Sequence, residues 1–184
     1  QAGGSLTLFA NNSVDRNFFG FIVPASFFQS INPLIIILLG PLIANFWLRI
    51  DRSDHKINTS QKMGIGLILL SAGFFLIMYV NNSNASYISL WWLVGVYFLH
   101  TLGELCLSPI GLSMVSKVSP KKIASLMMGF WFLSAAIANY SAGKLPTILK
   151  LNNIDLFTFL TIMSIVAGIV LISIAPLMEK LVRK

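Results

Sequence analysis

Charged side chains are scarce in this 184-residue sequence: only 10% of the residues are Asp, Glu, Lys or Arg, and 56% are hydrophobic. An ordinary soluble domain has about 25% charged residues, and it needs polar groups to cover its surface. The scarcity therefore excludes a soluble globular domain. The mean hydropathy of +0.81 also excludes a disordered chain. An integral membrane protein is the class that remains.

Cysteine and the known catalytic motifs are also nearly absent. The single cysteine, Cys106, allows no intramolecular disulfide, and no Cys/His cluster has the spacing of a metal site. Sequence signatures of metalloproteases, serine hydrolases and phosphate-binding loops are missing. We therefore expect no metal, no bound cofactor and no enzymatic activity.

Long stretches without any charge are what the sequence does contain, at 17–48, 63–103, 123–143 and 156–178. A helix that crosses a bilayer core about 30 Å thick needs about 20 apolar residues, whereas outer-membrane strands alternate over about ten. The sequence thus predicts an all-α membrane protein of one domain, 1–184, in the lipid bilayer. Five full transmembrane helices are expected, at about 24–47, 63–80, 89–116, 123–148 and 156–178. Residues 1–10 resemble the tail of a sixth.

Lysine and arginine are divided unevenly between the connections of these helices. One side holds only Arg16, Lys144 and Lys150, and the other side holds the remaining ten basic residues, in 49–62, 117–122 and 180–184. Basic connections stay in the cytoplasm, so we expect a cytoplasmic C-terminus and residues 81–88 outside. Because the net charge of +7 comes from these connections, it indicates topology and not a nucleic-acid partner. A helix before residue 1 would complete six spans, one half of a twelve-helix transporter.

Glu104 is the only carboxylate inside any of the five predicted spans, and it lies near the middle of its own, 89–116. Such a charge costs at least about 2.5 kcal/mol on insertion, so it usually faces a partner or a water-filled cavity. His100, Thr101 and Ser108 share its helical face, one turn away on either side. Glu104 is therefore the first candidate for a functional site, although a purely structural hydrogen bond remains an alternative.

Other polar or helix-breaking residues leave two interpretations open. His100 can relay protons or simply hydrogen-bond a neighbouring helix. Pro109 and Gly111 are expected to interrupt their span, as a hinge for gating or as a static kink. Asn32, beside Pro33, can face a cavity or hydrogen-bond to backbone groups that the proline leaves unpaired. Trp131, about 15 Å into its span, can line a cavity or pack against neighbouring helices.

Three segments resemble one family closely: PASFFQSINP at 24–33, GELCLSPIGLS at 103–113 and SLMMGFWFLS at 125–134. They are similar to the eighth, tenth and eleventh helices of the proton-dependent oligopeptide transporters of the major facilitator superfamily. Their order and spacing hold over essentially the whole chain. The resemblance implies the C-terminal helix bundle of such a transporter, without the N-terminal half and its ExxER proton-coupling motif.

The resemblance also implies roles for single residues. Glu104 matches the carboxylate that receives the amino group of a peptide, and Asn32 and Ser108 match polar residues of the same site. Trp131 and Phe132 match an aromatic wall. The implied function is proton-coupled symport of di- and tripeptides across the cytoplasmic membrane, with protons as coupling ion and the N-terminal half as partner. The alternatives are a transport-inactive fragment or assembly subunit and, with less support, a membrane-embedded enzyme.

Overall fold

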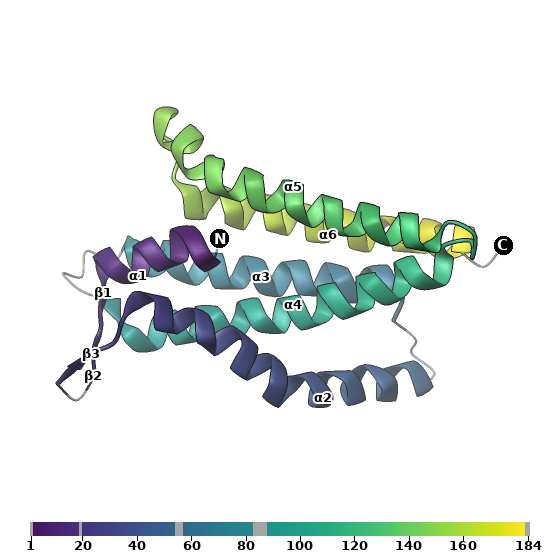
Figure 1. Ribbon diagram of the computed structural model, residues 1–184, viewed down its shortest axis with the longest axis horizontal. Coiled ribbons are helices and arrows are strands. Elements are labelled where there is room, and N and C mark those ends of the chain that lie inside the picture. Colours follow the sequence, from purple (N-terminus) through teal and green to yellow (C-terminus); the bar gives the residue numbers. More distant parts are fainter. Residues whose placement is uncertain (1, 19, 54–56, 83–87, 183–184) are drawn as a thin grey trace.

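Five long helices follow the charge-poor stretches of the sequence (Figure 1). The structure, a computed structural model, describes residues 2–18, 20–53, 57–82 and 88–182. The helices have 22 to 29 residues each, and their bounds are α2 Ile31–Arg52, α3 Thr59–Asn81, α4 Leu90–Val118, α5 Ala124–Leu151 and α6 Leu156–Val182. They correspond to the five predicted spans. Within the described residues, four segments are long and apolar enough to cross a membrane: Ala25–Arg52, Thr59–Asn81, Leu90–Val118 and Leu156–Leu177.

Helix α5 is as long as the others but is not among these four segments, because polar residues such as Ser134, Asn139, Ser141 and Lys144 interrupt it. Leu149 is its only buried residue. In Figure 1, α5 and α6 lie together on one side of α3 and α4. The position of α5 leaves its polar residues accessible.

The first predicted span begins differently from the expectation. Ala25–Ser30 forms a 3-10 helix, η2, and the α-helix starts only at Ile31. Pro33 therefore lies in the first turn of α2, where its missing N–H leaves no hydrogen bond unmade. The bend of α2 visible in Figure 1 is near its middle, where Pro41 lies inside the helix.

The expected interruption at Pro109 and Gly111 does not divide the helix, and a hinge or kink there stays a prediction. Helix α4 runs continuously from Leu90 to Val118 with Pro109 inside it. Flanking turns can hold a helix through a proline when neighbouring helices support it. Pro109 therefore produces no break that would separate two helical segments.

The connection before α2 and the connection before α4 meet at one end of the bundle. Ala2–Leu6 forms a π-helical turn, η1, which continues into α1, Thr7–Ser13. After α1, strand β1 (Val14–Asp15) pairs in parallel with β4 (Ile88–Ser89), and β2 (Asn17–Phe18) pairs antiparallel with β3 (Phe21–Ile22). The β1–β4 pairing places the connection before α2 beside the connection before α4. That agrees with the predicted topology, in which both lie on the same side of the membrane.

Helix α3 lies between α4 and α6, and glycines allow the close contact on both sides. A Cβ atom added to Gly103 would lie 2.6 Å from the carbonyl oxygen of Gly66, across the α3–α4 contact. A Cβ atom added to Gly168 would lie 3.1 Å from the carbonyl oxygen of Gly64, across the α3–α6 contact. Small residues at such crossings let membrane helices approach closely.

The hydrophobic core lies at the end of the bundle where the strands are. It joins α1, η2, α3, α4 and α6, and its most buried members include Leu6, Phe28, Ile77, Leu93 and Val96. Phe9 of α1 meets Phe157 of α6 edge to face, with ring centroids 5.6 Å apart. This core fixes the short N-terminal helix against the long ones.

Candidate functional site: a polar cavity around Glu104

Glu104 and Asn32 meet across two helices. The Asn32 side-chain amide donates a hydrogen bond to Oε2 of Glu104 at 2.9 Å. Glu104 stands midway along α4, and Asn32 stands in the first turn of α2. The amide oxygen of Asn32 is buried and has no partner among the described residues. The contact joins two residues that the sequence analysis placed in one site.

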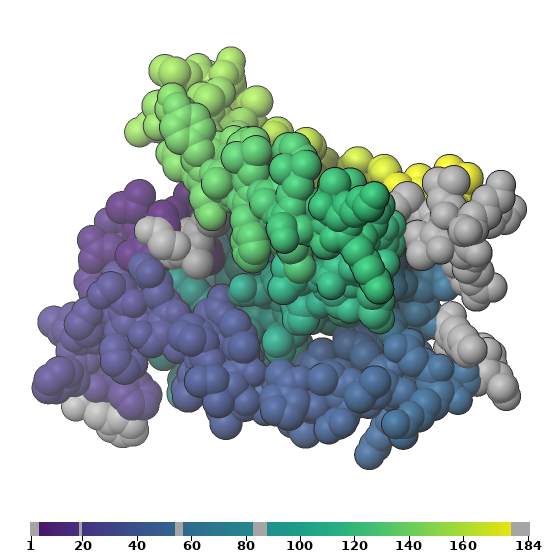
Figure 2. Space-filling model, turned by 45° about the vertical axis from the view of Figure 1, so that its right-hand side comes forward, coloured from purple at the N-terminus to yellow at the C-terminus, as the bar shows by residue number. Residues whose placement is uncertain are grey.

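The pair lines a cavity of about 650 Å³. Its walls come from α2, α3, α4, α5 and α6, so residues far apart in the sequence face one space. Figure 2 shows the surface hollowed between α2, in indigo and blue, and α5, in green. The lining residues are Asn32, Leu70, Phe74, His100, Glu104, Leu107, Ser108, Ala138, Asn139, Ser141, Ala142, Leu145, Leu160 and Ser164.

The composition of this lining defines its chemistry. Its described residues include no Lys or Arg that could pair with the Glu104 carboxylate. The polar groups around it are hydroxyls, amides and the imidazole of His100. A carboxylate in such surroundings attracts a cationic group, and the neutral polar groups can orient that group by hydrogen bonds.

Three polar lining residues were not singled out by the sequence analysis: Asn139 and Ser141 on α5, and Ser164 on α6. The signal was present, since Asn139 is an amide inside an uncharged stretch. The sequence does not predict which face of α5 turns toward Glu104, because polar residues occur on several faces of this helix.

His100 lines the same cavity one turn before Glu104. Its ring packs edge to face on Phe74 at 4.5 Å between centroids, and a Cβ atom added to Gly73 would collide with it. The Nε2 atom is buried and has no hydrogen-bond partner among the described residues. The packing of the ring between α3 and α4 favours the structural interpretation over the relay.

The remaining candidates are not among the residues that line the cavity, and Pro109 lines a second cleft. Trp131 packs on Gly111, where any added Cβ atom would collide with the indole. Phe132 is 62% exposed on α5. Trp131, Phe132, Pro109 and Gly111 are all outside the cavity lining, so the structure unites only Glu104, Asn32 and Ser108 of the predicted site residues.

No cluster of His, Cys, Asp or Glu suited to a metal ion occurs in the part of the chain that the structure describes.

Part of the topology prediction rests on residues that lie outside the described ones, namely Lys56, residues 83–87, Arg183 and Lys184. The site is thus a cavity with one carboxylate, among membrane-length helices.

Together the fold and the cavity define an integral membrane protein of the transporter class. The family model described as the POT family matches residues 1–178, and the chain belongs to this family. This confirms the predicted family and the all-α transporter fold. Members of the family are transporters, so the prediction that the chain is not an enzyme is confirmed as well.

Individual relatives agree with this assignment. The chain is 38% identical to the peptide transporter YePEPT of Yersinia enterocolitica over 85% of its own length and 31% of that protein. It is 36% identical to dipeptide and tripeptide permease A of Proteus mirabilis, over 81% of the chain and 30% of the permease. The chain therefore spans about a third of the length of these curated relatives.

Solved structures show the same arrangement of helices. A POT family transporter in complex with 5-aminolevulinic acid matches 96% of the chain, with a TM-score of 0.84 and 31% identity. A POT family transporter in complex with a thioalcohol-conjugated peptide matches 95%, with the same TM-score and identity. In both cases the match covers 37% of the solved chain.

Proposed function

We propose that this chain forms the C-terminal half of the substrate cavity of a proton-coupled symporter of di- and tripeptides. The observation that carries the proposal is the Glu104 carboxylate, which faces a polar cavity whose described lining contains no Lys or Arg. A peptide has a cationic amino group at neutral pH. Glu104 binds that amino group, and Asn32 holds the carboxylate in place through its amide hydrogen bond.

Other residues have supporting roles in this proposal. Ser108, one turn beyond Glu104 in the same cavity, offers a hydroxyl to the peptide. Phe132 is exposed on α5 and contacts peptide side chains, with Trp131 beside it as part of the same aromatic wall. The packing of Trp131 on Gly111 couples α5 to α4 near Pro109, where we place the gating hinge.

Proton coupling, the cytoplasmic membrane and a cytoplasmic C-terminus complete the proposal. They are supported by the resemblance to proton-dependent transporters and by the unequal distribution of basic residues. The N-terminal half of the transporter is the partner that closes the cavity. Relatives whose names state peptide, dipeptide or tripeptide transport support the substrate class.

Substitution of Glu104 tests the proposal in the full-length transporter. Glu104→Gln keeps the shape of the side chain and removes its charge. Loss of one partner of a buried charge pair costs about 3–5 kcal/mol, and water in an open cavity reduces this. We expect a loss of about 2 kcal/mol, or roughly thirtyfold in the Kd of a free dipeptide.

An N-acetylated dipeptide is the control, because it has no cationic amino group. It should bind weakly to both proteins and lose little further affinity on substitution. Equal weakening of the free and the acetylated dipeptide would show that Glu104 does not bind the amino group. Isothermal titration calorimetry of the free and the acetylated dipeptide against the wild type and Glu104→Gln measures the four dissociation constants.

A further inference from the structure

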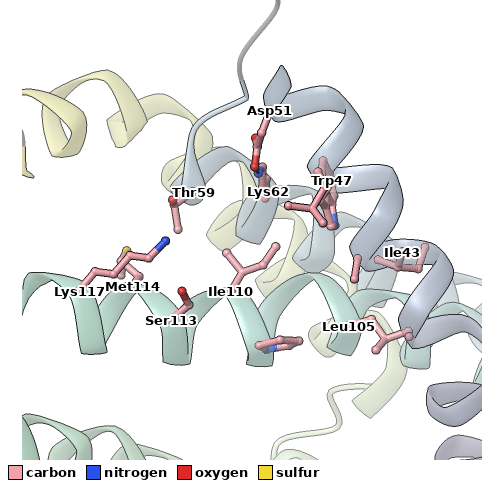
Figure 3. A pocket seen from close by; sticks show the side chains of 14 residues that line it. Ile43, Trp47, Asp51, Thr59, Lys62, Leu105, Ile110, Ser113, Met114 and Lys117 are labelled. Atoms are coloured by element: carbon pink, nitrogen blue, oxygen red, sulfur yellow. Dashed lines mark hydrogen bonds and ion pairs between the residues drawn. The ribbon is translucent and has the colours of Figure 1, made fainter. Parts of the chain in front are cut away.

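A second cleft runs between α2, α3 and α4, from Leu105 near the middle of α4 to Lys117 in its last turn, and it shares no lining residue with the Glu104 cavity. It has a volume of about 420 Å³. One part of its wall is polar, with Lys117, Lys62, Asp51, Ser113 and Thr59 (Figure 3). The other part is apolar and includes Ile43, Ala44, Leu48, Leu105, Ile110 and Met114.

The charges in the cleft do not cancel. Nζ of Lys62 lies 2.6 Å and 2.8 Å from the two carboxylate oxygens of Asp51, and it stands 5.3 Å from the centre of the Trp47 ring. That pair is neutral as a whole. Lys117 has no ion-pair partner among the described residues, and in Figure 3 it extends toward Thr59 at the start of α3. Among the described residues that line it, the cleft therefore carries a net single positive charge, that of Lys117.

The depth of the cleft matches the headgroup region of a bilayer. Lys117 follows Glu104 by 13 residues, which places it about 20 Å further along the axis of α4. If Glu104 is near the bilayer centre, the hydrocarbon core ends about 15 Å from it. The ammonium group then lies at the level of lipid phosphates, and the apolar wall lies at the level of the acyl chains.

We propose that this cleft binds one anionic phospholipid, with its phosphate at Lys117 and an acyl chain along the apolar wall. The hydroxyls of Ser113 and Thr59 donate hydrogen bonds to the phosphate or the glycerol. Basic pockets between transmembrane helices are the known form of such headgroup sites. Arg49 and Arg52, in the last turn of α2, add positive potential at the same end.

The test measures binding of tail-labelled phosphatidylglycerol to the purified chain in uncharged detergent, by fluorescence anisotropy at 0.15 M salt. Unlabelled phosphatidylglycerol should compete, whereas phosphatidylcholine and free glycerol phosphate should not. Lys117→Gln should weaken binding about fivefold, the factor expected for one lysine near an anionic headgroup. Ser113→Leu, which fills the cleft without changing charge, should weaken binding as well.

Lys121→Gln is the matched control, because Lys121 is an exposed lysine in the connection after α4 and does not line the cleft. It should leave the affinity unchanged. Equal effects of the two lysine substitutions would mean general attraction to the basic end of the bundle and would overturn the proposal. Competition by glycerol phosphate would overturn the lipid as occupant. Unchanged binding of phosphatidylglycerol to Lys117→Gln would also overturn it, provided that circular dichroism shows the same helix content in the variant as in the wild type.

Discussion

At the scale of single residues, the contact between Asn32 and Glu104 decides how the site is built. The amide reaches the carboxylate from another helix, over a distance of 72 residues in the sequence. A hydrogen bond to a charged acceptor contributes about 1.5–3 kcal/mol when buried, and less when the acceptor is accessible, as Glu104 is. The contact should therefore give measurable coupling between α2 and α4.

We predict a coupling energy of about 1 kcal/mol between Asn32→Ala and Glu104→Ala in a double-mutant cycle. The measurement is the free energy of unfolding of the chain in detergent. The control cycle pairs Glu104→Ala with Asn139→Ala, a residue of the same cavity that makes no hydrogen bond to Glu104. Additive effects in the first cycle would show that the hydrogen bond contributes nothing to stability.

At the scale of the elements, glycines decide how closely the helices approach. Gly66 and Gly103 bring the backbones of α3 and α4 together, and this contact sets the position of α4 and hence of Glu104. The helices themselves need no glycine there, since glycine in a helix interior is less favourable than alanine by roughly 0.5–1 kcal/mol. The two residues are thus explained by packing between helices.

Gly103→Ala should destabilise the chain by about 1–3 kcal/mol, the usual cost of an extra methyl group in a tight contact. Gly95→Ala is the matched control on the same helix, since a Cβ atom there has nothing within 4 Å. It should stabilise the chain by roughly 0.5–1 kcal/mol. Thermal unfolding in detergent distinguishes the two variants, and a stabilising Gly103→Ala would contradict the close contact.

At the scale of the whole molecule, the predicted topology has the two sets of connections on opposite sides of the membrane. In a Cys106→Ser background, Ser53→Cys should react with an impermeant maleimide only from the cytoplasmic side. Asn82→Cys should react only from outside. Both positions are exposed in the structure. Reaction of Asn82→Cys from the cytoplasmic side alone would invert the assignment.

The chain by itself is expected to be inactive in transport. Its cavity opens toward the space that the N-terminal half of a transporter occupies in our proposal, and the chain spans about a third of its curated relatives. Proteoliposomes that contain only these 184 residues should not accumulate a labelled dipeptide under a proton gradient. The full-length transporter is the positive control, and uptake by the chain alone would refute the expectation.

The sequence alone determined the membrane class, the five long helices and the family, and it predicted Glu104 as the first candidate for a site. Apolar length fixes a membrane helix because every backbone polar group must be satisfied within the bilayer. A carboxylate in such a helix is costly enough to mark a site without any tertiary information. Composition and local spacing are sufficient for these conclusions.

Only the tertiary structure decided which residues share the cavity. It turned Asn139 and Ser164 toward Glu104 and placed Trp131 on Gly111, outside the cavity lining. It also showed that α4 continues as one helix through Pro109. These outcomes depend on the rotation and approach of neighbouring helices, which are set by packing between residues far apart in the sequence and leave no periodic signal within any one helix.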